Sequence, residues 1–386
     1  MHERIATLAL EDGTILRGES YGADGQVCAE VVFNTSLSGY QEIISDASYR
    51  GQMIAFTCPH IGNVGVNEQD YESERAQCHA VIACEIETMP SNWRATQSLP
   101  DWLRAQNVIA IGGVDTRLLT RRIRERGVMK GVVSTVDDDA ERLMQKARAW
   151  EGLDGRDLVR EVTCDEMYVW AERTPSEFRP LPRSVRASPF AAEVQANGGA
   201  HVVVYDFGVK RNILRRLVSH GCRVSVVPAM TRSEETLSLK PDGILLSNGP
   251  GDPAALPYAA NAVRELLESD VPMFGVCLGH QLLGIALGAH TYKLKFGHHG
   301  GNHPVQHMRT GRIAITAQNH NYGVELHSLD QRRVEITHCS LNDGCVEGMR
   351  LKDQPVFSVQ YHPESSPGPH DSDDLFGEFM RLVQSR

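Results

Sequence analysis

The sequence lacks the features of membrane, nucleic-acid-binding and zinc proteins. No apolar run approaches the roughly 18 residues that a membrane-spanning helix needs, and residues 1–5 do not resemble the start of a secretion signal. The formal net charge of −10 at pH 7 argues against a nucleic-acid partner. The nine cysteines follow no metal-ligand spacing, so we expect no metal site and reduced thiols. These absences predict a cytoplasmic protein without membrane contact.

The length and composition are those of an ordinary soluble protein with two domains. The chain has 386 residues, of which 41% are apolar and 23% are charged. The stretch 174–200 contains four prolines and little periodicity, which is typical of a connector. We therefore predict an N-terminal domain over residues 1–154, a connector over 155–195 and a second domain over 196–386.

Short strands dominate the predicted N-terminal domain. Its clearest helix begins after Asp115, a good N-cap residue, and ends at Gly127. This helix carries five arginines, which could bind phosphates, but a solvated helix face is the commoner arrangement and we interpret the run as structural. The predicted strands cover residues 5–10, 14–17, 30–33, 53–56, 80–84 and 108–111.

Strands and helices alternate in the second domain. This alternation predicts a mostly parallel sheet with helices on both faces. Ligands of such sheets bind beyond the carboxyl ends of the strands, where the strand order reverses. The predicted class is therefore α/β, with a doubly wound sheet preceded by a smaller β-rich domain. The predicted strands are 201–206, 223–227, 243–247 and 272–276, and the predicted helices are 210–220 and 259–267.

Cys277 lies between two glycines at the end of a predicted strand. The apolar residues 272–276 run directly into it, and residues 278–287 have the apolar spacing of a helix that ends at Gly288. This strand-turn-helix pattern is that of a nucleophile elbow. A helix N-terminus and a nearby histidine both favour the thiolate, which is the attacking species. A buried structural cysteine is the alternative, and the glycines around Cys277 favour the elbow.

A candidate base follows later in the chain, in the run His362-Pro363-Glu364. The proline keeps the residue before it extended, so side chains two residues apart project to the same side. The segment 355–361 is a predicted strand, which places the pair at a strand's carboxyl end. Glu364 can then orient the imidazole of His362, as in a Cys-His-Glu triad.

A glycine-proline loop, residues 246–253, directly follows another predicted strand. Loops of this kind leave backbone N–H groups free, which suits an oxyanion hole together with the N–H of Leu278. The loop contains neither of the two common phosphate-binding glycine patterns.

Three of these motifs, at residues 275–281, 247–253 and 362–364, resemble the triad-type, class I glutamine amidotransferases. Other segments resemble more specifically the glutaminase, or small, chain of carbamoyl-phosphate synthase. The resemblance runs nearly from end to end and implies the class I glutamine amidotransferase fold for the second domain. These more specific segments are residues 33–42, 112–117, 295–304 and 317–320.

The resemblance implies a role for each matching residue. Cys277 would be the nucleophile, His362 the base and Glu364 the group that orients it. The family commonly has glycine and phenylalanine where Asn321 and Tyr322 stand. The resemblance therefore specifies neither the backbone φ of Asn321 nor the packing of the Tyr322 side chain. The implied glutamine contacts are Ser48, Gly249, Gly251, Leu278, Gln281, Asn319, Asn321 and Tyr322.

The resemblance also implies a partner. Glutamine would be hydrolysed through a cysteine thioester, and the ammonia would pass to a large ATP-dependent chain that makes carbamoyl phosphate from bicarbonate for arginine and pyrimidine synthesis. We expect no cofactor in this chain, with ATP and Mg²⁺ on the large chain. The functional unit would be a heterodimer, and a higher oligomer of it is compatible with the sequence.

Two alternatives compete with this prediction. The chain could be the glutaminase of another synthase, such as one for anthranilate or guanylate, although the N-terminal domain and residues 298–302 argue against it. It could also be a non-catalytic scaffold, as in relatives that have lost the cysteine. Cys277, His362 and Glu364 are all present, which argues against the scaffold.

Overall fold

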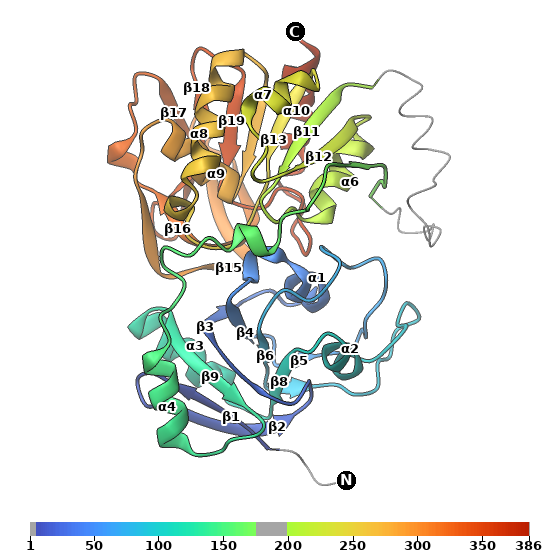
Figure 1. The fold of residues 1–386 in the computed structure, drawn as a ribbon, viewed down its shortest axis with the longest axis vertical. Coiled ribbons are helices and arrows are strands. Elements are labelled where there is room, and N and C mark those ends of the chain that lie inside the picture. Colours follow the sequence, from blue (N-terminus) through green and yellow to red (C-terminus); the bar gives the residue numbers. More distant parts are fainter. Residues whose placement is uncertain (1–4, 175–198, 386) are drawn as a thin grey trace. The chain divides into compact units, whose positions relative to one another are not determined.

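The computed structural model describes residues 5–174 and 199–385, which form two compact units (Figure 1). One unit comprises Met1–Asp154 and Leu294–Gly301, and the other comprises Gly155–Lys293 and Asn302–Arg386. Two features differ from the predicted division into domains. Residues 294–301 belong to the first unit, and residues 155–174 belong to the second unit instead of a connector. The remainder of the predicted connector, 175–195, lies outside the described residues.

The first unit is built on a closed barrel with the strand order β1-β2-β8-β6-β4-β3-β9. The three pairs β3–β4, β4–β6 and β6–β8 are parallel. The other pairs of the barrel are antiparallel. The predicted strands of this domain are all present, whereas β5, β7 and β9 were not predicted. The bounds are β1 Ile5–Leu10, β2 Ile15–Ser20, β3 Gln26–Asn34, β4 Gln52–Phe56, β6 Ala80–Ile82, β8 Ile109–Gly112 and β9 Met129–Ser134, with a separate pair β5 His60–Ile61 and β7 Glu85–Ile86.

Helices pack against the barrel strands, whose side chains alternate between two apolar clusters. Alternate residues of β3, β4 and β6 pack either with α1 and α2 or in a second cluster that contains Leu119 and Ile123 of α3. The predicted caps of α3 are observed, because Asp115 accepts a hydrogen bond from the N–H of Leu118 and Gly127 follows the last turn with a φ of 104°. The helices are α1 Tyr40–Ser45, α2 Leu99–Ala105, α3 Thr116–Arg126 and α4 Ala140–Ala149.

Residues 294–301 belong to the first unit because their backbone and side chains pack on it. The N–H of Val128 donates to the carbonyl of Lys295 at 2.8 Å. The N–H of Thr35 donates to the carbonyl of His299 at 3.2 Å, and the ring of Phe296 packs on that of Phe33. Two segments that are far apart in sequence, 33–42 and 295–301, therefore meet in one unit.

The second unit contains a sheet with the order β10-β12-β11-β13-β14-β19-β18-β17-β15-β16. Its centre, from β12 to β19, is parallel, as predicted, and β10 and the strands beyond β19 extend it with antiparallel pairs. The bounds are β10 Tyr168–Trp170, β11 His201–Asp206, β12 Arg223–Pro228, β13 Gly243–Leu246, β14 Met273–Val276, β15 Thr291–His307, β16 Ile313–Val324, β17 Val334–Ser340, β18 Val346–Leu351 and β19 Val356–Val359.

Helices cover both faces of this sheet, which confirms the predicted doubly wound α/β class. Alternate residues of β11 and β13 divide between two cores, one shared with α8 and α9 and the other with α6 and α10. Val159, fully buried in the first of these cores, explains why residues 155–174 belong to this unit. The helices are α6 Arg211–Ser219, α7 Ser233–Ser238, α8 Pro257–Leu266, α9 Leu278–Ala286 and α10 Asp374–Gln384. No helix in the described part of the chain combines the length and apolar character that a bilayer crossing needs.

Candidate active site

The carboxyl ends of neighbouring parallel strands bring the predicted motifs together. The strand order reverses between β11 and β13, which is where open α/β sheets bind ligands. The glycine-proline loop follows β13, Cys277 follows β14, and His362 and Glu364 follow β19, as the sequence predicted. A further segment, residues 207–210, follows β11 and was not predicted as part of the site.

Cys277 itself has the backbone conformation of a nucleophile elbow. Its φ of 54° and ψ of −104° are unusual for a residue other than glycine. The flanking glycines act by close packing, because a Cβ on Gly279 would lie 2.2 Å from the carbonyl oxygen of Leu246. The N–H of Cys277 donates to the carbonyl of Val359 at 2.9 Å, which ties the elbow to β19. The sequence therefore predicted the turn correctly. The unusual backbone conformation, however, is that of Cys277 itself and not of the glycines beside it.

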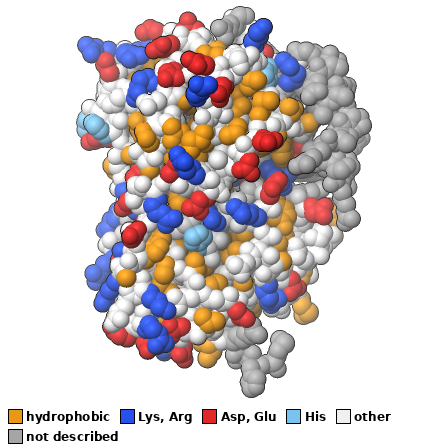
Figure 2. All heavy atoms as spheres, viewed as in Figure 1, with side chains coloured by type: hydrophobic (Ala, Val, Ile, Leu, Met, Phe, Trp, Pro, Cys, Tyr) orange, Lys and Arg blue, Asp and Glu red, His pale blue; other side chains and the backbone are white. Residues whose placement is uncertain are grey.

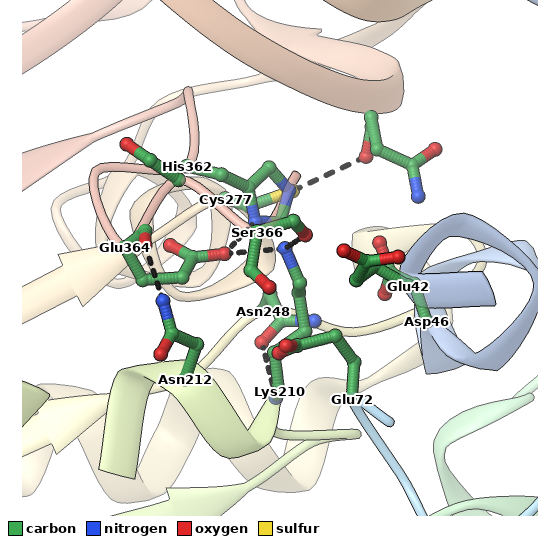
Figure 3. Close-up of polar contacts among 12 residues, drawn as sticks. Glu42, Asp46, Glu72, Lys210, Asn212, Asn248, Cys277, His362, Glu364 and Ser366 are labelled. Atoms are coloured by element: carbon green, nitrogen blue, oxygen red, sulfur yellow. Dashed lines mark hydrogen bonds and ion pairs between the residues drawn. The ribbon is translucent and has the colours of Figure 1, made fainter. Parts of the chain in front are cut away.

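His362 and Glu364 form a buried pair beside the elbow (Figure 3). The two atoms His362 Nδ1 and Glu364 Oε1 are 2.8 Å apart, and both side chains are almost completely buried. The N–H of His362 donates to the carbonyl of Ala317 at 2.9 Å, which fixes the backbone before the proline. No described residue makes a hydrogen bond of normal length to His362 Nε2. That nitrogen is therefore available for proton exchange with a reacting group.

Lys210 adds a fourth member behind the pair. Its Nζ donates to the same Oε1 of Glu364 at 2.8 Å and to the carbonyl of Ser366 at 2.6 Å. Asn212 Nδ2 donates to the backbone carbonyl of Glu364 at 2.5 Å. The ammonium and the carboxylate are 4% and 0% exposed, so this ion pair is shielded from water. Lys210 and Asn212 thus hold the position of the carboxylate that orients His362.

The charges of these groups determine the protonation of His362 and Glu364. Burial alone would lower the pKa of His362, but the Glu364 carboxylate and Cys277 outweigh it and raise that pKa to about 10. Burial alone would raise the pKa of Glu364, but Lys210 and His362 outweigh it and lower that pKa to about 2. Near neutral pH the pair is therefore an imidazolium and a carboxylate, so His362 can donate a proton to a reacting group.

The glycine-proline loop is fixed to the turn after β11. Asn248 accepts from the N–H of Lys210 at 3.0 Å and donates to the carbonyl of Gly208 at 3.0 Å. Ser247 Oγ accepts from the N–H of Phe207 at 3.0 Å. Gly249 lies so near this turn that a Cβ would be 2.2 Å from the carbonyl oxygen of Phe207. These contacts give the loop a defined backbone conformation before any ligand binds.

Most of the predicted glutamine contacts lie near the elbow. The thiol of Cys277 is 3.5 Å from the carbonyl oxygen of Asn319. The Gln281 amide donates to the carbonyl of Tyr322 at 2.8 Å and to Gln360 at 3.1 Å, so its NH₂ group already connects α9 to β16. Asn321 is within β16, and φ there is not left-handed, so replacing glycine at this position does not strain the backbone.

Two further residues of that prediction, Tyr322 and Ser48, lie in different units. Tyr322 is 8% exposed and its ring lies 5.9 Å from Lys293 Nζ, so its side chain has packing partners in the second unit. Ser48 belongs to the first unit, in the turn Ala47–Tyr49, where its N–H donates to Asp46 Oδ1 at 2.9 Å. The roles of all these residues in binding glutamine stay predictions.

Sequence reasoning missed Lys210, Asn212 and Asn248. One signal could have found Lys210: it lies in the turn after β11, a strand that borders the predicted switch point. The ion pair with Glu364 joins residues that are far apart in sequence, and no local spacing indicates it. Asn248 was included in the loop, but its amide contacts with the Lys210 backbone could not be anticipated.

Comparisons with known proteins agree with this fold. Residues 203–382 match the family model Glutamine amidotransferase class-I. The strand order, the elbow and this match together define the second unit as a class I glutamine amidotransferase domain. Residues 8–133 match the model Carbamoyl-phosphate synthase small chain, CPSase domain.

Full-length relatives identify the family. The carbamoyl phosphate synthase small chain of Nostoc sp. is 51% identical over 98% of this chain and 95% of that one. The small chain of Escherichia coli is 48% identical over 99% of this chain and 98% of that one. The chloroplastic small chain of Oryza sativa is 50% identical over 98% of this chain and 82% of that one. The chain belongs to the carbamoyl phosphate synthase small chain family. This membership excludes the predicted alternative of a glutaminase for another synthase.

Proposed function

We propose that this chain hydrolyses L-glutamine through a thioester on Cys277 and supplies the ammonia to a large, ATP-dependent chain. That chain would use it, with bicarbonate, to make carbamoyl phosphate for arginine and pyrimidine synthesis. The observation that carries the proposal is a buried series of four residues at the carboxyl ends of the parallel strands β11, β14 and β19: Cys277, His362, Glu364 and Lys210. It combines a nucleophile, a proton carrier and a fixed carboxylate.

The reaction follows from these groups. The Cys277 sulfur attacks the side-chain carbonyl carbon of glutamine, and a tetrahedral intermediate forms with negative charge on oxygen. His362 Nε2 then gives its proton to the departing nitrogen, and ammonia leaves a glutamyl thioester. Water, deprotonated by the same nitrogen, attacks the thioester and releases glutamate. Throughout the cycle Glu364 keeps the imidazole oriented, and Lys210 keeps Glu364 ionised.

Backbone N–H groups would stabilise the tetrahedral oxygen. Within the described residues, the N–H groups of Leu278 and Gly251 donate no hydrogen bond. Leu278 opens α9, where the N–H groups point out of the helix and the helix dipole favours negative charge. Gly251 has a φ of 87°, which a residue with a side chain rarely adopts. Each such donor contributes a rate factor on the order of 10² to 10³.

The test of this function is a glutaminase assay of the purified chain, alone and with its co-purified large chain. Glutamate release that requires Cys277 supports the proposal. A chain that binds the large chain but releases no glutamate in either state would be a scaffold, the remaining alternative from the sequence.

We expect the isolated chain to be a poor glutaminase that the complex activates. The site makes ammonia but this chain has no sequence motif for activating bicarbonate with ATP, and uncoupled hydrolysis would waste glutamine. Coupled sites typically change each other's binding affinity by about 5- to 150-fold, and we expect an activation of similar size in kcat/KM. The measurement compares kcat/KM for glutamine in the chain alone and in the complex with ATP and bicarbonate. Equal values would favour a free-standing glutaminase.

Replacing Lys210 by methionine should reduce kcat/KM for glutamine by roughly 10- to 100-fold through misorientation of Glu364 and His362. It should also move the acid limb of the pH profile. Lys210 lowers the pKa of Glu364, so the carboxylate is charged above about pH 2 and loses its charge as pH falls. Without Lys210 this pKa rises, and activity should be lost at a pH higher by about 1 to 3 units.

Two further variants separate positioning from stability. Lys210→Arg keeps the positive charge and should retain the wild-type acid limb. Arg215→Met removes a similarly buried cation of α6 that is ion-paired with Glu172, and it should leave the pH profile unchanged. If Lys210→Met loses stability but keeps the wild-type acid limb, Lys210 has only a structural role.

A further inference from the structure

The segment that follows residue 154 lies against the loop that contains Gly251. We call residues 155–161 the strap; they include the short 3₁₀ helix Val159–Glu161 and belong to the second unit. A Cβ on Gly251 would lie 3.5 Å from the carbonyl oxygen of Arg156 and 3.5 Å from Cδ1 of Leu158. These distances are those of ordinary van der Waals contact, so the strap packs directly on the backbone of Gly251.

Asp252, the residue after Gly251, connects the same loop to the strap by a hydrogen bond. Its Oδ2 accepts from the N–H of Gly155 at 3.2 Å, and its Oδ1 accepts from the N–H of Ala254 at 2.9 Å. The first half of the loop is fixed to the turn after β11. The loop is therefore held from two sides, by that turn and by the strap.

The strap is itself anchored in the second unit. Val159 is fully buried in the core shared with α8 and α9, and Leu158 is 2% exposed. The hydroxyl of Tyr258, in α8, donates to Asp157 Oδ1 at 3.4 Å, and the Arg160 guanidinium lies 5.8 Å from the centre of the Tyr258 ring. Because a shift of the strap would break these contacts, it provides a rigid support for the loop.

The outward side chains of the strap pair with one another. Arg156 lies 3.6 Å from the Glu161 carboxylate, and Arg160 Nε donates to Asp157 at 2.8 Å. Charged side chains of both signs are likewise interspersed over the face of the molecule drawn in Figure 2. The outer side of the strap is therefore an ordinary solvated surface, and its distinctive contact is the inner one, between Leu158 and the loop.

We propose that the strap sets the position of the Gly251 N–H for the tetrahedral oxygen, with Leu158 and Asp252 as positioning residues. This rests on the proposed function, because it requires an oxygen that becomes negatively charged in that reaction. Gly251 has a φ of 87° and no side chain, so its own atoms hinder rotation of the neighbouring peptides little. The packing of Leu158 and the hydrogen bond of Asp252 restrict this rotation. A displacement of the N–H by about 1 Å can cost on the order of 10² in rate.

The test separates binding of the tetrahedral state from binding of glutamine. The probe is the aldehyde analogue of glutamine, in which CHO replaces the carboxamide. Its carbonyl carbon bonds to the Cys277 sulfur and its oxygen gains the thiol proton, which gives a tetrahedral adduct without a leaving group. The affinity for this probe is measured in the complex with the large chain, beside kcat and KM for glutamine. Binding of glutamine itself is measured in complexes that also carry Cys277→Ala.

Leu158→Ala removes the packing on Gly251. We expect kcat for glutamine and the affinity for the aldehyde to fall by a similar factor, about 10- to 100-fold, while glutamine binding stays within about twofold. Leu158→Met keeps most of the volume and should retain both wild-type values within about threefold. The matched control is Leu351→Ala in β18, which removes a similarly buried leucine. It should lower the melting temperature and leave the affinity for the aldehyde unchanged.

A second variant, Asp252→Ala, guards against a folding defect, because this side chain is partly exposed. It removes the acceptor of the Gly155 N–H and should show the same pattern with a smaller loss, about 3- to 10-fold. Wild-type affinity for the aldehyde in both Leu158→Ala and Asp252→Ala overturns the proposal. So does an equal loss of glutamine binding, because the strap would then shape the whole substrate site. A wild-type complex that neither releases glutamate nor binds the aldehyde would contradict the proposed function itself.

Discussion

Replacing Cys277 by alanine is expected to abolish glutamine hydrolysis, a loss on the order of 10⁴-fold or more. The alanine chain should still bind the large chain, and the complex should still make carbamoyl phosphate from added ammonium. Only the thioester step requires the sulfur, because ammonium supplied directly replaces the product of that step. The measurement pairs glutamine-dependent with ammonium-dependent synthesis in the same preparation.

Cys84→Ala is the matched control for this experiment. Cys84 is an exposed free cysteine of the first unit, so its removal tests whether thiol loss in general affects the assay. It should leave both activities unchanged. Normal glutamine turnover in the Cys277→Ala chain would remove Cys277 from the mechanism.

Replacing His362 by asparagine should lower kcat for glutamine by about 10² to 10⁴-fold with little change in binding, because the histidine acts in proton transfer. Glu364→Gln should be milder, about 100-fold or less, since the glutamine side chain can still accept the His362 hydrogen bond. Steady-state kinetics with substrate-binding measurements separate the two effects. A Glu364→Gln chain as inactive as Cys277→Ala would contradict this ranking.

The Glu364 carboxylate also determines the alkaline limb of the pH profile of glutamine hydrolysis. Because the pKa of His362 is raised to about 10, the imidazolium persists at neutral pH and is lost as pH rises through that value. Glu364→Gln removes the main group that raises this pKa, and burial then lowers it. In that variant the loss of activity at high pH should therefore begin about 1 to 3 units earlier. An unchanged alkaline limb would show that another group controls it.

The local parts of the site could be predicted from the sequence. A strand, a cysteine between glycines and a helix are consecutive, so the elbow follows from backbone sterics and apolar spacing alone. His362 and Glu364 are two residues apart, and the proline between them leaves few conformations. The alternation of strands and helices from residue 201 to 287 specified the parallel centre of the sheet in the same way.

The parts of the fold and of the site that the sequence did not predict depend on contacts between segments that are distant in sequence. Lys210 meets Glu364 only because β11 and β19 end at the same edge of the sheet, although β13 and β14 lie between them. The antiparallel strands β15 to β18 were not predicted, because β15 is rich in glycine, histidine and lysine and β17 is only partly buried. The membership of residues 294–301 in the first unit rests likewise on long-range contacts with Thr35 and Val128.

The most direct test of the account is to isolate the covalent intermediate. The complex is mixed with glutamine, quenched in acid, digested and analysed by mass spectrometry. The account predicts one glutamyl group on the peptide that contains Cys277, sensitive to hydroxylamine as a thioester is, and absent from the Cys277→Ala chain. Glutamine hydrolysis without this adduct, or with the adduct on another residue, would contradict the central claim that Cys277 is the nucleophile.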